Sequence, residues 1–165
     1  MIPHIITPRR IGRDYMKKWK VYLTSILLTF LVGGVSGLIS RGAMQEYAGL
    51  VKPMLSPPAW IFPVVWTILY ILMGIGVARV YIKTEEVPTI YIAQLFFNFM
   101  WSIIFFNFGA YLFAFIWLIA LIILVIIMTV RFYRVDKLAG LIQIPYILWL
   151  LFAGYLNFMV YMLNR

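Results

Sequence analysis

Several residue types are scarce or absent, and each absence excludes a class of chemistry. The 165 residues include no cysteine, so neither a disulfide nor a thiolate metal site can form. The single histidine, His4, lies near the N-terminus, which excludes a multi-histidine metal site and argues against a histidine-based hydrolytic triad. No Asp, Glu, Lys, Arg or His lies inside the long apolar stretches, which disfavours a pump or an ion-coupled transporter. We therefore predict neither a metal nor a cofactor.

Apolar residues dominate the chain instead. They make up 65% of it against 12% charged residues, and the mean hydropathy is +0.99. The runs are continuously apolar and do not alternate, which favours helices over a membrane barrel. The sequence thus predicts an all-α polytopic membrane protein, with a basic tail at 1–20 and a bundle of five transmembrane helices within 21–165. The five uncharged runs are residues 21–39, 61–78, 90–108, 111–130 and 138–163.

The net charge of +9 does not indicate nucleic-acid binding, because the cations follow the ends of the predicted spans. With five spans, eleven of the 14 Lys and Arg residues share one side of the membrane. By the positive-inside rule the N-terminus is cytoplasmic, and the first loop and the C-terminus are extracytoplasmic. Basic residues at the bilayer surface also attract anionic lipid, so we expect membrane lipid, and no nucleic acid, as a partner. The eleven cations are Arg9, Arg10, Arg13, Lys17, Lys18, Lys20, Arg79, Lys83, Arg131, Arg134 and Lys137.

A proline-rich loop leads into the second apolar run, with the sequence KPMLSPPAWIFPVVWTILY. Proline fixes φ and lacks an N–H, so Ser56 followed by Pro57 predicts a helix start, and Pro63 predicts a kink or a start near itself. The loop at 41–60 is long enough to form a semi-rigid lid. Trp60 then becomes a candidate ligand contact at the entrance to the bundle. The alternative is an ordinary loop before a membrane helix with interfacial tryptophan anchors.

Glycine and proline elsewhere predict local departures from straight helices. Gly33 and Gly37 have the spacing that lets two helices approach closely, although Gly34 beside them suggests simple flexibility as readily. The very short connection at Gly109 predicts a tight hairpin between the third and fourth spans. Pro145 cannot donate a backbone hydrogen bond, so we expect it to bend the fifth span.

Polar and aromatic residues form a stripe on each of three spans, because each residue turns a helix by roughly 100°. Amides must find partners in a membrane, so they are expected to face inward. They could act only as contacts that hold helices together, or they could line a cavity for a flat hydrophobic ligand. Three stripes, each with a tryptophan, favour the cavity. The candidate ligand-binding residues are Phe62, Trp66 and Tyr70 in the second span, Gln94, Asn98 and Trp101 in the third, and Tyr146, Trp149, Ala153 and Asn157 in the fifth.

Three segments together resemble the tryptophan-rich sensory protein / translocator protein family (TspO/MBR, the peripheral-type benzodiazepine receptors). They are KPMLSPPAWIFPVVWTILYILMGIG, QLFFNFMWSIIFF and PYILWLLFAGYLN, and the resemblance covers roughly residues 21–165 in matching order. It implies a five-helix membrane protein, commonly a homodimer. It also implies a pocket under the first loop that binds porphyrins and, in animal members, cholesterol and benzodiazepine-type drugs.

The resemblance implies roles for individual residues as well. Trp66 and Trp149 match two tryptophans implicated in light-dependent protoporphyrin breakdown by some bacterial members. Asn98, Trp101 and Ala153 match pocket-lining positions. The chain also departs from the family pattern, since a Glu-Tyr pair at 46–47 stands where members often have Trp-Tyr before the Lys-Pro motif. That departure puts one aromatic contact of the lid in question.

We therefore expect an integral membrane receptor or sensor that binds protoporphyrin-like tetrapyrroles, with sterols or benzodiazepine-type compounds as further candidate ligands. Two alternatives stay open. One is an enzyme that degrades porphyrin in light, with Trp66 and Trp149 as the catalytic residues; the other is a passive exporter of tetrapyrroles. A cationic contact to porphyrin propionates would have to come from Arg41 or Lys52 in the first loop.

Overall fold

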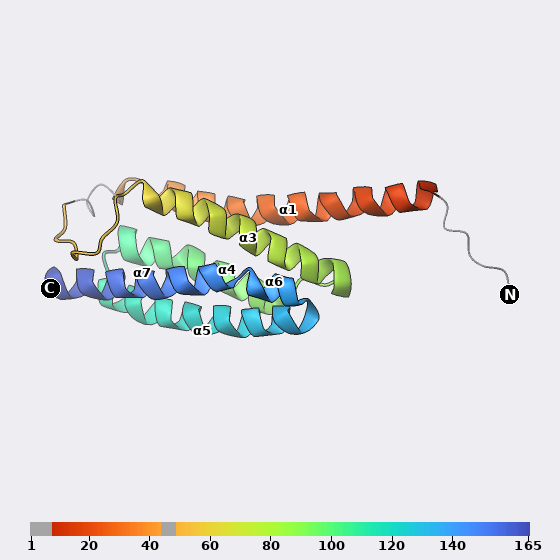
Figure 1. Cartoon of the computed structure of the whole chain (residues 1–165). Coiled ribbons are helices and arrows are strands. Elements are labelled where there is room, and N and C mark those ends of the chain that lie inside the picture. The colour runs from red at the N-terminus through yellow and green to blue at the C-terminus, as the bar shows by residue number, and fades with distance from the viewer. Residues whose placement is uncertain (1–7, 44–48) are drawn as a thin grey trace.

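The structure, a computed structural model, describes residues 8–43 and 49–165, with side chains from residue 18 onward. No strand occurs in these ranges, and the predicted all-α class is confirmed. His4 and the 46–47 pair lie outside the described residues. The helices are α1 (Pro8–Ser40), α3 (Ile61–Thr84), α4 (Thr89–Ser102), the π-helix η1 (Ile103–Asn107), α5 (Tyr111–Val135), α6 (Lys137–Leu141) and α7 (Ile144–Leu163) (Figure 1).

In the described part of the chain, five helical segments are long and apolar enough to cross a membrane. They confirm the five predicted spans and the integral, multi-pass class. Two boundaries differ from the prediction: α3 continues to Thr84 rather than ending near residue 78, and α1 already begins at Pro8, within the predicted basic tail. The predicted bounds stopped at the charged residues, but the helices continue through them. Lys and Arg are good helix formers, and their long side chains can reach toward water from the end of a membrane span.

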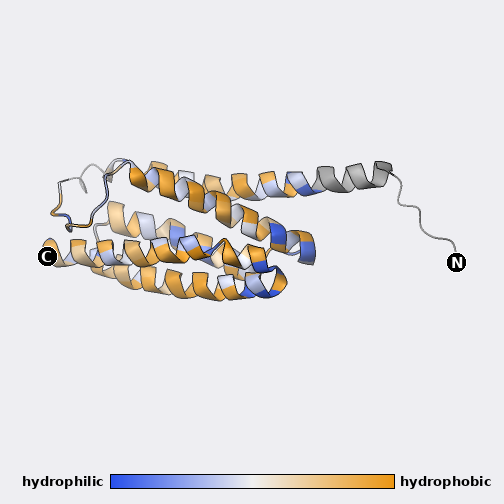
Figure 2. Ribbon diagram, viewed as in Figure 1, coloured by the Kyte–Doolittle hydropathy of each residue, from blue (hydrophilic) through white to orange (hydrophobic). Residues whose placement is uncertain are grey.

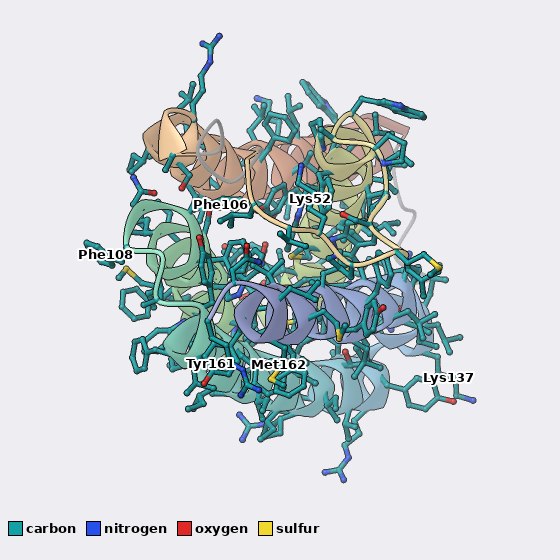
Figure 3. All side chains as sticks on the ribbon, turned by 90° about the vertical axis from the view of Figure 1, so that its left-hand side faces the viewer. Lys52, Phe106, Phe108, Lys137, Tyr161 and Met162 are labelled. Carbon is teal, nitrogen blue, oxygen red and sulfur yellow. The ribbon has the colours of Figure 1, made fainter. Side chains whose placement is uncertain are left out.

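Two groups of helices form the bundle: α5 touches α4, α6 and α7, while α1 packs mainly on α3. Seen from the end that holds the first loop, α1 and α3 lie above α4 and α7, and α5 lies below them (Figure 3). One face of α5 is fully buried, with Leu118, Leu121 and Val125 in the core. Its other face exposes Ile116 and Ile123, as a helix in contact with lipid would. The fourth span therefore packs on one side and faces lipid on the other.

The proline-rich segment ends differently from the prediction. Ser56 is not a helix cap: its N–H donates to the carbonyl of Pro53 (2.9 Å) in a turn, and α3 begins only at Ile61. The predicted start at Ser56 is therefore wrong, because Pro57 and Pro58 continue an irregular chain. Pro63 lies in the first turn of α3, where its missing N–H leaves no helical bond broken.

The fifth span is broken rather than bent near Pro145. The first part, α6, ends at Leu141, and α7 begins at Ile144 with Pro145 in its first turn. Gln143 fills the break: its N–H donates to Gly140, and its carbonyl accepts from Tyr146 (3.0 Å each). The predicted hairpin between the third and fourth spans is present, and Gly109 supplies its left-handed backbone (φ 58°).

Hydrophilic residues gather at the end of the bundle opposite the first loop (Figure 2). There Asp136, 5% exposed, pairs with Arg79 through two hydrogen bonds of 2.9 Å and with Lys83 at 2.7 Å. Its carboxylate also accepts from the N–H of Ala139 (2.9 Å), which caps α6. Arg79 and then Lys83 hold the pKa of the Asp136 carboxyl well below its usual range. This cluster joins α3 to α6 and was not predicted.

Candidate ligand-binding site

A cavity of about 540 Å³ opens beneath the segment that joins α1 to α3. It reaches down to Tyr70, nine residues into α3, or about 14 Å from the start of that helix at 1.5 Å per residue. Four helical faces and the proline-rich segment enclose it. The lining residues are Phe30, Gly33, Gly34, Ser36 and Gly37 of α1, Lys52, Ser56, Pro57 and Ala59 of the segment, Phe62, Pro63, Trp66, Thr67 and Tyr70 of α3, Asn98, Trp101, Ser102, Phe105 and Phe106 of α4 and η1, and Ala153, Leu156 and Asn157 of α7.

Aromatic rings form the two main walls. On α3, Trp66 and Tyr70 stack with their centroids 5.4 Å apart and an interplanar angle of 27°. On α4 and η1, Trp101 and Phe105 stack at 5.4 Å and 23°. The π-helix lets both Phe105 and Phe106 reach the cavity, because its wider turn rotates the side chains that follow α4. Flat, apolar walls of this kind suit a flat, apolar ligand.

A chain of hydrogen bonds forms the floor of the cavity and continues behind it. The Tyr70 hydroxyl donates to Oδ1 of Asn98 (3.0 Å), and Nδ2 of Asn98 donates to the Tyr146 hydroxyl (3.0 Å). Tyr146 in turn donates to Oε1 of Gln94 (3.1 Å). The chain links α3, α4 and α7 and leaves each of these polar groups with a protein partner, which is what an apolar interior requires.

A second polar contact joins three helices nearer the loop. Trp101 donates from Nε1 to Oδ1 of Asn157 (3.2 Å), and Nδ2 of Asn157 donates to the carbonyl of Tyr111 (2.7 Å). Asn98 and Asn157 therefore do both things that the sequence left open: each holds helices together, and each lines the cavity. Their predicted inward orientation is confirmed, since Asn98 is 3% and Asn157 is 1% exposed.

Seven of the eleven predicted site residues line the cavity: Phe62, Trp66, Tyr70, Asn98, Trp101, Ala153 and Asn157. The other four do not. Gln94 and Tyr146 lie behind Asn98, and Trp60 is 66% exposed on the outer surface. Trp149 lies behind Phe62, with the two ring centroids 5.8 Å apart. Its Nε1 is buried and has no hydrogen-bond partner among the described residues. Direct ligand contact by any of these residues stays a prediction.

The glycines of α1 form one wall of the cavity, and none of them was among the predicted site residues. Gly33, Gly34 and Gly37 line the cavity, and a Cβ on Gly33 would overlap the ring of Tyr70. The spacing of Gly33 and Gly37 indicated a close approach of another helix. It did not indicate that Gly33 packs against a side chain while Gly34 and Gly37 have open space beside them. Ser102, a second missed lining residue, shares a hydrogen bond of 3.0 Å with the Ser40 hydroxyl. Within the described ranges, no group of three or more His, Cys, Asp or Glu side chains could hold a metal ion. The lining side chains carry aromatic rings, amides, hydroxyls and the ammonium of Lys52.

Five spans around an aromatic cavity define an integral, multi-pass membrane protein. The chain belongs to the TspO/MBR family, whose family model matches residues 25–163. It is 39% identical over 150 residues to the tryptophan-rich protein TspO of Archaeoglobus fulgidus, covering 86% of this chain and 95% of that protein.

Two further relatives carry names that describe the same family. The chain is 32% identical over 146 residues to a tryptophan-rich sensory protein of Cereibacter sphaeroides, covering 85% of this chain and 92% of that protein. It is 37% identical over 137 residues to the translocator protein of Homo sapiens, covering 79% and 81% of the two chains. The resemblance stated from the sequence motifs is therefore confirmed.

Proposed function

We propose that this protein is a membrane receptor or sensor whose cavity binds flat, hydrophobic ring ligands of the protoporphyrin type. The observation that carries the proposal is the pair of stacked aromatic walls, Trp66 with Tyr70 and Trp101 with Phe105, on helices that enclose one cavity. Its volume of about 540 Å³ lies within the roughly 300–1,000 Å³ typical of small-molecule sites. Each ring pair formed with a ligand adds roughly 0.5–1.5 kcal/mol beyond area burial.

The polar groups of the cavity favour a ligand that is apolar where it lies deepest in the cavity. Tyr70, Asn98 and Asn157 each have a protein partner, so an apolar ligand edge leaves none of these bonds broken. A ligand with many polar groups would have to compete with those bonds, and a buried polar group without a partner costs free energy. Sterols and benzodiazepine-type compounds are also largely apolar, and they serve as competitors in the test.

Light-dependent porphyrin breakdown is the second candidate, because Trp66 lies in the cavity wall where its indole would touch a bound macrocycle. Trp149 does not line the cavity and would act through Phe62, a lining residue whose ring it touches. Binding and breakdown are separable by experiment, since binding persists in the dark.

The binding test uses purified protein in detergent, titrated with protoporphyrin IX in the dark while tryptophan fluorescence is followed. Gly34→Leu should fill the cavity, because Gly34 lines it and a Cβ there meets nothing within 4 Å. We expect its affinity to fall by about tenfold or more, a change of about 1.4 kcal/mol. Val35→Leu is the matched control, since Val35 is the next residue and is 40% exposed on the outer face. Equal affinities in the two variants would refute the assignment of the cavity.

A further inference from the structure

The charge of the cavity is concentrated at its mouth. Among the described residues that line the cavity, Lys52 alone carries a formal charge. It belongs to the segment between α1 and α3, beside the lining residues Ser56 and Pro57. Seen from that end of the bundle, Lys52 lies over its centre, between α3 above and α7 below (Figure 3).

The backbone on both sides of Lys52 is held in place. The N–H of Val51 donates to Oδ1 of Asn164 (3.0 Å), and Nδ2 of Asn164 donates back to the carbonyl of Val51 (2.9 Å). On the other side Pro53 is buried, and its carbonyl accepts from Ser56. Two anchors within a few residues fix the direction from which the Lys52 side chain approaches the cavity, so less conformational entropy is lost when it meets a ligand.

The deep part of the cavity is unsuited to an ionised group. Tyr70 and Asn98 bond to each other, Trp101 donates to Asn157, and the adjoining wall of α1 presents glycine. An ionised carboxylate placed among them would lose its hydration without gaining a cation, which is strongly unfavourable. The mouth combines access to water with a lysine, whose ammonium can donate to a carboxylate.

We infer that Lys52 recognises the carboxylate groups of a ring ligand, so that the ligand binds with its acidic edge at the mouth and its apolar edge on the floor. The inference rests on the proposed function and adds a ligand class to it: amphiphilic ring acids, preferred over their neutral esters. Lys52 is thus a residue that determines specificity and orientation, while the aromatic walls supply most of the binding energy.

The test is a cycle that changes both partners, Lys52 and the ligand acids. Wild type and Lys52→Met are titrated in the dark with protoporphyrin IX and with its dimethyl ester, in the same detergent. Comparing the two proteins for each ligand removes the difference in partitioning between acid and ester. We expect Lys52→Met to weaken the acid about three- to tenfold and to change the ester by less than about twofold, as for a partly solvated ion pair.

Two further variants separate a direct contact from a general field. Lys52→Arg should retain the preference for the acid, since it keeps the charge. Arg41→Met removes a cation of the same loop that is exposed and does not line the cavity, so it should leave both affinities within about twofold at about 0.15 M salt. Equal losses for Arg41→Met and Lys52→Met would overturn the inference in favour of nonspecific attraction.

The outcomes also distinguish this inference from the proposed function. If Lys52→Met affects acid and ester alike, or neither, while Gly34→Leu still blocks both ligands, Lys52 has no role in acid recognition and the cavity assignment survives. If neither ligand binds wild type saturably, the proposed function fails and the inference fails with it. Unfolding midpoints of all variants are measured first, so that a loss of folded protein is not mistaken for a loss of affinity.

Discussion

Gly33 and Gly37 provide the sharpest test of the cavity wall, because they lie one turn apart on the same helix and meet different surroundings. Both line the cavity. A Cβ on Gly33 would overlap Cε2 and Cζ of Tyr70, whereas a Cβ on Gly37 meets nothing within 4 Å. We therefore expect Gly33→Ala to destabilise the fold and Gly37→Ala to be neutral or stabilising.

The magnitude follows from what holds the Tyr70 ring. It is 8% exposed, stacks on Trp66 at 5.4 Å, meets the edge of Phe30 at 6.4 Å and donates to Asn98. Overpacking of such a ring costs roughly 1–3 kcal/mol, and the lost interhelical hydrogen bond about 0.6 kcal/mol. Replacing glycine in a helix returns up to about 1 kcal/mol, but this gain is common to both variants and cancels between them. Gly33→Ala should thus be about 2–3 kcal/mol less stable than Gly37→Ala.

The assay is equilibrium unfolding of both variants in mixed micelles, followed by tryptophan fluorescence. A control tests the stated cause: in a Tyr70→Ala background the ring is absent, so Gly33→Ala should cost about as little as Gly37→Ala. If Gly33→Ala and Gly37→Ala differ by less than about 0.5 kcal/mol in the protein that retains Tyr70, the placement of the Tyr70 ring against α1 is refuted.

Three other predictions concern the opposite end, the tryptophans and the orientation. Asp136→Asn should be about 1–2 kcal/mol less stable at neutral pH, because it removes a carboxylate shared by two cations that are themselves partly exposed. Since the pKa of Asp136 is lowered by folding, its contribution is present above the unfolded value of 3.8 and is lost as the pH falls below it; a variant with the same acid dependence as wild type would contradict this. Trp66→Phe should keep most porphyrin affinity but abolish any light-driven loss of porphyrin absorbance, and Trp149→Phe should do the same; wild-type breakdown rates in both well-folded variants would exclude their role. A reporter fused after Arg165 should be active only outside the cytoplasm, and activity inside it would show that the inferred orientation is reversed.

Trp149 illustrates how far a helical stripe can be interpreted. It shares a face of α7 with Ala153 and Asn157, and the period of the helix alone places all three inward. In the structure Ala153 and Asn157 line the cavity, while Trp149 does not and instead packs against Phe62 of α3. Periodicity specifies a direction around one helix. Whether a neighbouring helix covers an inward-facing residue depends on helix tilt and side-chain volume, and the sequence of one helix does not specify these.

Asp136 and Arg79 show the same limit for charge. The sequence placed Arg79 at the cytoplasmic end of its span by the positive-inside rule, but gave no role to Asp136. Their pairing across 57 residues of sequence arises because the turn between α5 and α6 holds Asp136 against Arg79, near the end of α3. The hydrogen bond between Tyr70 and Asn98 likewise joins residues 28 positions apart on different helices, so the sequence of either helix alone does not predict it.

The sequence by itself determined the class, the five spans and the inward faces of the amide stripes, because each depends on local quantities: the length of an apolar run, the period of a helix and the need of a buried amide for a partner. The tertiary structure alone decided which glycine of α1 packs on Tyr70, which tryptophan lines the cavity, and that Lys52 rather than Arg41 lies at its mouth. These features depend on contacts between helices distant in sequence, where an ångström of approach separates a cavity from a packed interface.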